Sequence, residues 1–116
     1  MNVYECCKYE IGHFENYLEK REFLFAPDAD TAKTIFRANN GYRKNARGIE
    51  INQIKMVLAH RYRKAKIISH REYSEDYRCA GYTTRTEVVQ GCYCSHCKGE
   101  TSATSQLCTN CGAMFV

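Results

Sequence analysis

The chain has no tryptophan, one proline and no apolar run near the ~20 residues that a membrane-spanning helix requires. The sequence therefore predicts no membrane-bound role. Pro27 is the only proline, and no stretch rich in glycine and serine divides the chain. Such stretches commonly link independent domains. We expect one compact domain, or a main domain with a short module docked on it.

Sequence patterns that carry catalysis are also missing. We find no glycine-rich phosphate loop, no Ser/His/Asp order in a useful context and no convincing pair of carboxylates. Asp28 and Asp30 precede a segment of helical periodicity, where aspartate commonly caps the first turn. We therefore expect a protein that is not an enzyme, has no catalytic residues and takes no small-molecule substrate.

The first residues, Met-Asn-Val-Tyr-Glu-Cys-Cys-Lys, lack the basic start and apolar stretch of a secretory signal. This favours a cytoplasmic protein. Cytosolic cysteines stay reduced, so the eight cysteines of this chain indicate metal binding before disulfides.

Four cysteines form the most informative motif. Cys94 and Cys97, then Cys108 and Cys111, make two Cys-x-x-Cys pairs with ten residues between them. Two residues between cysteines let both thiolates of a tight turn point at one ion, and two such turns complete a tetrahedral zinc site. Because four thiolates leave no open position for water or substrate, we expect one structural zinc ion.

Other uses of these cysteines are less favoured. Two disulfides would require an oxidising compartment, and a thioredoxin-like redox pair would require a βαβ context. Iron can replace zinc among four thiolates, which would make the protein a rubredoxin-like electron carrier. Zinc is the better expectation for a structural site.

The segment Cys94–Val116 resembles the short zinc-ribbon modules, which commonly read Cys-Pro-x-Cys-Gly, about ten residues, then Cys-x-x-Cys-Gly. Ser95 stands in place of the usual proline and Lys98 in place of the usual glycine. Gly99 and Gly112 are expected to provide the positive φ that turns backbone amides toward the sulfurs. The resemblance covers the last fifth of the chain. It implies a small β-rich, zinc-nucleated module of a kind found in nucleic-acid-binding and protein-docking proteins.

The other four cysteines, Cys6, Cys7, Cys79 and Cys92, are expected to be small buried hydrophobes. A second metal site built from some of them with a histidine is an open alternative. Cys6 and Cys7 would point to opposite faces of a strand, so only one of the two could ligate. Cys92 could also take the place of Cys94.

Positive charge is concentrated in one part of the chain. Residues 33–71 contain eleven lysines and arginines against one acid, whereas the flanking segments are acidic. Such an island suggests a polyanionic partner, usually nucleic acid, although a solvated basic face or an acidic protein target would also explain it. The candidate binding residues are Arg37, Arg43, Lys44, Arg47, Lys55, Arg61, Arg63, Lys64 and Lys66.

Aromatic and imidazole side chains lie among these cations. Tyr42 and Tyr62 can either stack on unpaired bases or pack in the core with their phenols at the rim. His60 and His70 flank the densest basic stretch and are expected at the surface. His96, between two ligands, is expected to be solvated.

The pattern predicts an α+β fold: a small mixed sheet with one or two helices and a C-terminal zinc ribbon. We expect strands at residues 2–11, 21–26, 65–78 and 81–90, and a helix from Asp28 or Asp30 to Ala38. Residues 48–68 fit helical spacing and strand alternation alike, and a helix is favoured. The last two strands should meet near Cys79-Ala80-Gly81 and lead into the ribbon. The division would be a basic domain at 1–90 and a ribbon at 91–116.

We therefore predict a non-catalytic zinc protein that binds nucleic acid or a nucleoprotein complex through a basic surface in residues 33–71. The alternative is an inhibitor or adaptor that docks, by protein–protein interaction, on a larger nucleic-acid-processing machine with an acidic surface.

Overall fold

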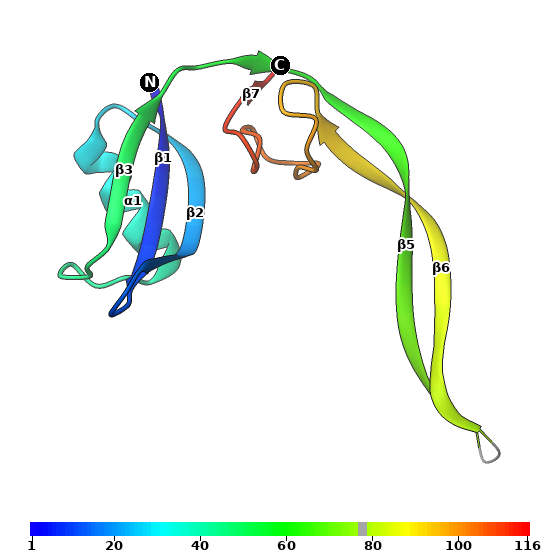
Figure 1. Ribbon diagram of the computed structural model, residues 1–116. Coiled ribbons are helices and arrows are strands. Elements are labelled where there is room, and N and C mark those ends of the chain that lie inside the picture. Colours follow the sequence, from blue (N-terminus) through cyan, green and yellow to red (C-terminus); the bar gives the residue numbers. More distant parts are fainter. Residues whose placement is uncertain (77–78) are drawn as a thin grey trace.

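The computed structural model describes the backbone of residues 1–76 and 79–116, and the side chains outside residues 75–80. Figure 1 shows a sheet with one helix, a small cysteine-rich ribbon beside it, and a long hairpin that projects away. The elements are β1 (Asn2–Ile11), β2 (Asn16–Ala26), α1 (Ala29–Asn40), β3 (Ile49–Ile54), β4 (Leu58–Ala59), β5 (Arg61–Asp76), β6 (Cys79–Cys94) and β7 (Met114–Phe115).

The first half of the chain is an antiparallel sheet of order β2-β1-β3 with α1 packed on one face. Successive residues of a strand point to opposite faces, so Tyr4 and Cys6 of β1 both face the helix. They form a buried cluster with Leu24, Ala26, Ala32 and Phe36. This cluster is the main apolar core. The predicted strands at 2–11 and 21–26 are confirmed, and the second begins earlier than expected, at Asn16.

The predicted helix is also confirmed. Asp28 is the N-cap: its Oδ1 accepts a hydrogen bond from the Thr31 N–H at 2.7 Å. This interaction lowers the pKa of the Asp28 carboxyl. The helix runs two residues beyond Ala38 and ends at Gly41, whose φ of 68° is left-handed.

The helix predicted over residues 48–68 is wrong, because this segment forms β3, β4 and the start of β5. Ile49 and Ile51 alternate along β3 and pack against the core under α1, where they complete the third strand of the sheet. The spacing of apolar residues fits both periods, and pairing with β1 decides between them. Within the described residues α1 is the one helix, so the fold is α+β but dominated by strands in open sheets.

β5 and β6 form a two-stranded antiparallel hairpin, with sixteen residues in each strand. At about 3.4 Å per residue each strand is roughly 50 Å long. The Cα radius of gyration is 19.2 Å, against about 13 Å for a compact domain of this length, because the hairpin projects from the rest (Figure 1). The strands predicted here are confirmed as far as the structure describes them. The predicted meeting point at Cys79-Ala80-Gly81 is wrong, since these residues already belong to β6, and residues 77–78 lie outside the description.

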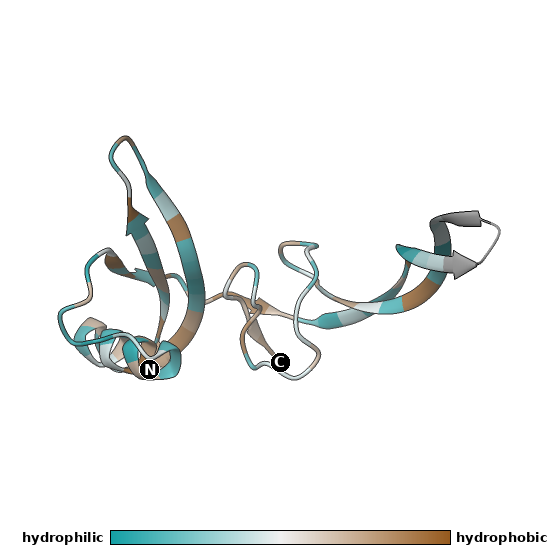
Figure 2. Cartoon of the chain, turned by 90° about the horizontal axis from the view of Figure 1, so that it is seen from below, coloured by the Kyte–Doolittle hydropathy of each residue, from teal (hydrophilic) through white to brown (hydrophobic). Residues whose placement is uncertain are grey.

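β6 ends at Cys94, so the hairpin continues directly into the C-terminal ribbon, as the sequence predicted. The short strands β4 and β7 pair in parallel next to it, joining the chain before the hairpin to its C-terminal end. Figures 1 and 2 both place this ribbon between the three-stranded sheet and the hairpin. The predicted domain boundary at residue 90 stays a prediction.

The ribbon packs against the face of the sheet opposite α1. A Cβ atom on Gly112 would lie 2.5 Å from Phe23 Cδ1 in β2 and 2.7 Å from Ile54 Cδ1 in β3. Both side chains point to this face, because their register partners in β1 are odd-numbered residues. Only glycine permits this close approach. Within the described residues, no helix combines the length and the apolar character needed to cross a bilayer.

Gly112→Ala should therefore destabilise the protein more than Gly41→Ala. Both glycines have a positive φ, which costs a side-chain-bearing residue about 1–2 kcal/mol, but Gly41 has open space where a Cβ would go. The contact with Phe23 and Ile54 adds roughly 1–3 kcal/mol for Gly112→Ala alone. Chemical denaturation of the metal-loaded protein measures both values. Equal losses for the two variants would contradict the packing of the ribbon on the sheet.

Candidate metal centre

The four sulfur atoms of Cys94, Cys97, Cys108 and Cys111 lie within 4.8 Å of one another. Two cross-pairs, Cys94 with Cys111 and Cys97 with Cys108, have Sγ–Sγ distances of 3.8 Å. Metal–sulfur bonds of about 2.3 Å in a tetrahedron also separate the sulfurs by about 3.8 Å, whereas a disulfide would need about 2 Å. The cluster can therefore hold one metal ion, and its donor set is compatible with zinc.

Two similar turns present these sulfurs. In the first, the Lys98 N–H donates to the Cys94 carbonyl at 2.9 Å, and in the second the Gly112 N–H donates to the Cys108 carbonyl at 2.9 Å. Each turn is closed by a further backbone bond, from Cys94 N–H to Gly99 O and from Cys108 N–H to Ala113 O. The two motifs in the sequence therefore fold into two equivalent turns.

The expectation that glycines supply the positive φ is half confirmed. Gly112 has a φ of 80°, but in the first turn the left-handed residue is Lys98, with a φ of 61°. The Lys98 ammonium lies 5.9 Å from the Tyr62 ring centroid, a cation–π contact that offsets part of this strain. Glycine is required at position 99 for a steric reason instead, because a Cβ there would lie 2.3 Å from the side-chain Nδ2 of Asn110.

Asn110 is a member of the site that the sequence analysis did not single out. Its side-chain Nδ2 donates to the Cys97 sulfur at 3.2 Å, and its backbone N–H donates to the Cys108 sulfur at 3.3 Å. Asn110 thereby joins the two turns and neutralises part of the negative charge of bound thiolates. The signal was its place inside the second Cys-x-x-Cys, where N–H groups commonly face sulfur.

The pKa values of the cysteine thiols indicate that a cation is needed to ionise the cluster. Burial raises the pKa of the Cys94 thiol and raises that of Cys111 to about 12. Burial acts in the same direction on Cys108, but the N–H groups of Asn110 and Cys111 outweigh it and lower the pKa of Cys108 to about 7. The protein's own dipoles therefore favour the Cys108 thiolate, whereas burial favours the protonated form of Cys94 and Cys111. A divalent cation is what ionises the rest of such a set.

Ser95 shows why this chain departs from the usual proline at that position. Its backbone N–H donates to the His60 carbonyl at 2.9 Å, and its hydroxyl accepts from the His60 N–H at 2.9 Å. Proline has no N–H and could make neither bond. The pair connects the metal turn to the residue before β5. The exposed side chain of His96 lies outside the sulfur cluster, as predicted.

Of the other cysteines, Cys6 and Cys7 are buried as the sequence predicted, whereas Cys92 is only half-buried. Cys6 and Cys7 are buried, and desolvation raises the pKa of both thiols, that of Cys6 to about 12. Cys92 is half-buried and unpaired, and it is Cys94 that joins the cluster. No second group of metal-binding residues is found among the described side chains. The side chain of Cys79 lies outside them.

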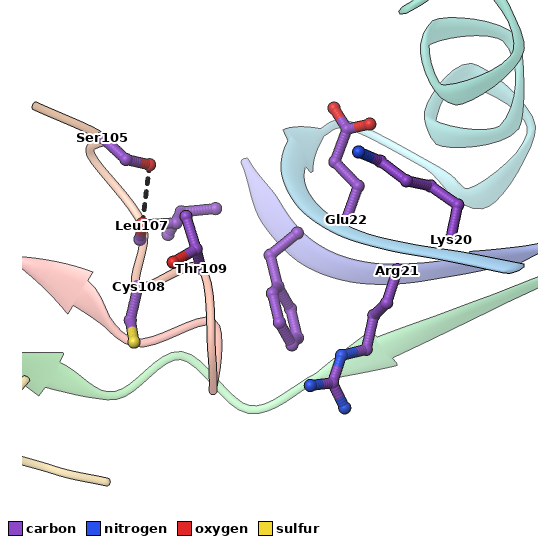
Figure 3. Close-up of a pocket in the computed structure, with 8 residues that line it drawn as sticks. Lys20, Arg21, Glu22, Ser105, Leu107, Cys108 and Thr109 are labelled. Carbon is purple, nitrogen blue, oxygen red and sulfur yellow. Dashed lines mark hydrogen bonds between the residues drawn. The ribbon is translucent and has the colours of Figure 1, made fainter. Parts of the chain in front are cut away.

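A cleft of about 320 Å³ lies between β2 and the loop that leads to Cys108. Figure 3 shows Lys20, Arg21 and Glu22 on the strand side of this cleft and Thr109 on the ribbon side. The cleft lies along the same border between sheet and ribbon at which Gly112 contacts Phe23 and Ile54. Of the strand residues, Arg21 and Phe23 point to the ribbon side, whereas Glu22 accepts hydrogen bonds from Asn39 and Asn40 of α1 on the other face of the sheet.

The nine predicted binding residues fall into separate groups rather than one surface. Arg37 lies in α1; Arg43, Lys44 and Arg47 lie in the loop before β3; Lys55 lies between β3 and β4; and Arg61, Arg63, Lys64 and Lys66 lie in β5. In both views the sheet with α1 and the hairpin lie on opposite sides of the ribbon (Figures 1 and 2). Arg37 is half-buried and donates to the Lys44 carbonyl at 2.9 Å, so it orders the loop.

Two of the basic residues in β5 are engaged with the ribbon. The Arg61 guanidinium donates to the Ser105 carbonyl and lies 4.8 Å from the Phe115 ring centroid. The Lys66 ammonium pairs with the Glu100 carboxylate. Both contacts fix the base of the hairpin to the ribbon, a role that a count of charges did not predict.

The tyrosines chosen from the sequence are engaged as well. Tyr42 packs against Phe36, with ring centroids 5.7 Å apart, at the edge of the core. Tyr62 stacks on Tyr93 across the hairpin at 5.7 Å. The structure therefore supports core packing for Tyr42, whereas Tyr62 packs against a tyrosine of the hairpin and not in either core cluster.

Comparison with known proteins finds no matching family model, no matching curated protein and no matching solved structure. The likeness to zinc ribbons therefore depends on the four cysteines and on the geometry of their two turns.

Cys97→Ser should remove the bound metal and unfold the ribbon, because a tetrahedral site loses one of its four thiolates. Metal analysis of the purified wild-type protein should show about one zinc per chain, and hydrogen exchange should report protection of residues 94–116. The matched control is Cys92→Ser, which changes a cysteine two residues from Cys94 but outside the cluster. Full metal content in Cys97→Ser would contradict the ligand set. A coloured, iron-containing protein would contradict zinc.

Proposed function

We propose that the ion is zinc and that the protein binds nucleic acid, or a nucleoprotein complex, without catalysing a reaction. The metal has a structural role, because all four of its positions are filled by the cysteines. The binding element is the hairpin β5–β6. A cytoplasmic location and the absence of a small-molecule substrate belong to the same proposal.

The observation that carries the nucleic-acid role is the state of the charges on the hairpin. Arg63 and Lys64 are exposed and form no ion pair with any described residue. An arginine or lysine left free at the surface can neutralise a phosphate and release its counterion. Free cations along an extended element suit a long polyanion better than a small ligand.

The ribbon supports this function by holding the hairpin at its base. A two-stranded hairpin is marginal in water unless something packs against it. Here Tyr62 and Tyr93 stack at the base, and Lys66 pairs with Glu100 beside the metal turns. The metal centre thus orders the surface from which the cations project.

Arg63→Ala should weaken binding across sequences and reduce the salt slope of log K by about 0.7–0.9, because one phosphate contact is lost. Arg85→Ala is the matched control, since Arg85 lies on the same hairpin but within 3.8–3.9 Å of Glu72 and Glu87. Both variants lose one positive charge, so a difference between them reports a local contact. Fluorescence anisotropy with labelled DNA and RNA over a salt series measures the slopes. Identical slopes in both variants, or no binding by the wild type, would contradict the proposal.

A second candidate function, docking on a protein, is favoured by the tip of the β1–β2 hairpin. Ile11, Phe14, Tyr17 and Leu18 are exposed there, and Phe14 is fully accessible. Apolar side chains gathered at one tip commonly mark an interaction site. In this reading the protein is an adaptor or inhibitor whose basic hairpin lies beside a nucleic-acid-processing partner.

A photo-reactive amino acid at position 14 tests the docking function in living cells. The expected result is one dominant cross-linked protein that belongs to a nucleic-acid-processing complex. The same amino acid at Ala103, an exposed residue of the ribbon, is the control. Equal cross-linking from both positions, or none from position 14, would contradict a docking role for this tip.

A further inference from the structure

The hairpin has two chemically different faces. Directly opposed residues of β5 and β6 point to the same side, so the register assigns every side chain to one face. One face, which we call the odd face, carries the odd-numbered residues of β5 from Arg61 to Tyr73 and the even-numbered residues of β6 from Tyr82 to Cys94. The right-handed twist of a two-stranded ribbon makes this face wind around the hairpin axis, as Figure 1 shows.

The odd face exposes large apolar side chains to solvent. Ile67 and Val88 oppose each other and are 73% and 69% exposed. Nearer the far end, Tyr73 and Tyr82 oppose each other and are 56% and 73% exposed, with their rings in edge contact at 5.4 Å. Figure 2 shows a hydrophobic segment in the otherwise hydrophilic hairpin. These pairs shield little of each other's surface, so a ligand that covers them gains apolar contact.

The charges of the two faces differ as well. Over the stretch defined above, the odd face contains Arg61, Arg63 and Arg71 and no carboxylate. The acids of the same stretch, Glu72 and Glu87, lie on the other face, where they pair with Arg85 and His70. From Arg61 to Tyr73 and from Tyr82 to Cys94, where the side chains are described, the odd face therefore combines positive charge without a carboxylate and an aromatic and aliphatic surface.

Positive charge next to exposed aromatic side chains favours single-stranded over double-stranded nucleic acid as the ligand. A duplex presents phosphates on its outside and hides the faces of its bases, so Tyr73, Tyr82 and Ile67 would have no apolar surface to cover. Unpaired bases offer that surface: every base has a π-face that stacks on an aromatic ring, and basic residues beside the rings follow the phosphates. The two exposed tyrosines can provide the stacking contact, and Arg71, two residues before Tyr73 and next to it on the same face, can provide the phosphate contact.

We infer that the odd face of the β5–β6 hairpin is a binding site for single-stranded nucleic acid, in which Tyr73 and Tyr82 stack on unpaired bases and Arg63 and Arg71 contact phosphates. This inference is based on the proposed nucleic-acid function and narrows it to one class of ligand. Single-stranded RNA and DNA share the recognised chemistry, so the site admits both in principle.

The test compares the binding of labelled oligo(U), oligo(dT) and a mixed-sequence DNA duplex to the full-length, metal-loaded protein. The wild type should prefer the single strands, and the two single-stranded probes show which sugar is favoured. Tyr73→Ala with Tyr82→Ala should reduce single-strand affinity at least about fivefold, the loss expected for one stacked base. The same variant should leave the weaker duplex affinity unchanged.

Two further variants separate stacking from folding. Tyr73→Phe with Tyr82→Phe keeps both rings and should retain the single-strand affinity, while Leu58→Ala removes an exposed apolar side chain outside the β5–β6 hairpin and should have no effect. Metal content and circular dichroism confirm that each variant is folded. If the alanine variant loses structure, the quenching of tyrosine fluorescence on titration with oligo(dT) is compared between the wild type and the double phenylalanine variant, which keeps the two rings but lacks the Tyr73 and Tyr82 fluorophores. Equal quenching in the two proteins would contradict the inference.

The outcomes distinguish the two proposals. Wild-type protein that binds none of the three probes contradicts the proposed function and, with it, this inference. Wild-type protein that binds duplex as well as single strands, or an alanine variant with undiminished single-strand affinity, overturns the inference alone and leaves a nucleic-acid binder that reads phosphates without stacking.

Discussion

The meeting of four sulfur atoms is the constraint on which the second half of this structure depends. The buried cluster around it consists of Ala59, Ala113, Cys94 and Cys108, which are small residues with little apolar surface to bury. At about 25 cal/mol per Å² such a core cannot by itself order the last segment of the chain. Bonds from the four thiolates to a metal ion would supply the free energy that packing does not, and folding of the ribbon would then be coupled to metal binding.

The position of the β5–β6 hairpin also depends on the sulfur cluster, through the ribbon. Its base is attached to the ribbon through His60 and Ser95, through Arg61 at Ser105, and through Lys66 at Glu100, while the rest of its length packs on no other described element. A metal ion held by the four cysteines would therefore act on a surface that extends tens of ångströms away, by fixing the end from which the two strands start. The first half of the chain is different in kind, since Phe36 and its neighbours form an ordinary apolar core under α1. Metal removal should consequently act on one part of the molecule and leave the other folded.

The sequence was sufficient where the signal is local. The Cys-x-x-Cys spacing predicts the sulfur cluster, and Asp28 predicts the start of α1, because turns and caps are determined by residues a few positions apart. It was insufficient where partners are distant. Residues 49–54 became a strand because β1 had a free edge, and Asn110 and Ser95 became supports of the metal site because Cys97 and His60 lie opposite them. Periodicity carries no information on such pairings.

Charge shows the same limit more sharply. The total of +10 over residues 33–71 treats all eleven cations as equivalent, yet the structure ties Arg37, Arg61 and Lys66 into internal contacts and divides the remainder among α1, two loops and the hairpin. What decides the ligand is therefore not how many cations the segment has but which apolar groups accompany the free ones. The apolar groups beside Arg71 are two exposed tyrosines. An acidic protein surface could be bound by the cations alone and would not require these rings. A partner that is recognised by charge alone gives no reason for the exposed aromatic rings. A single strand with unpaired bases would account for the cations, through its phosphates, and for the rings, through its bases.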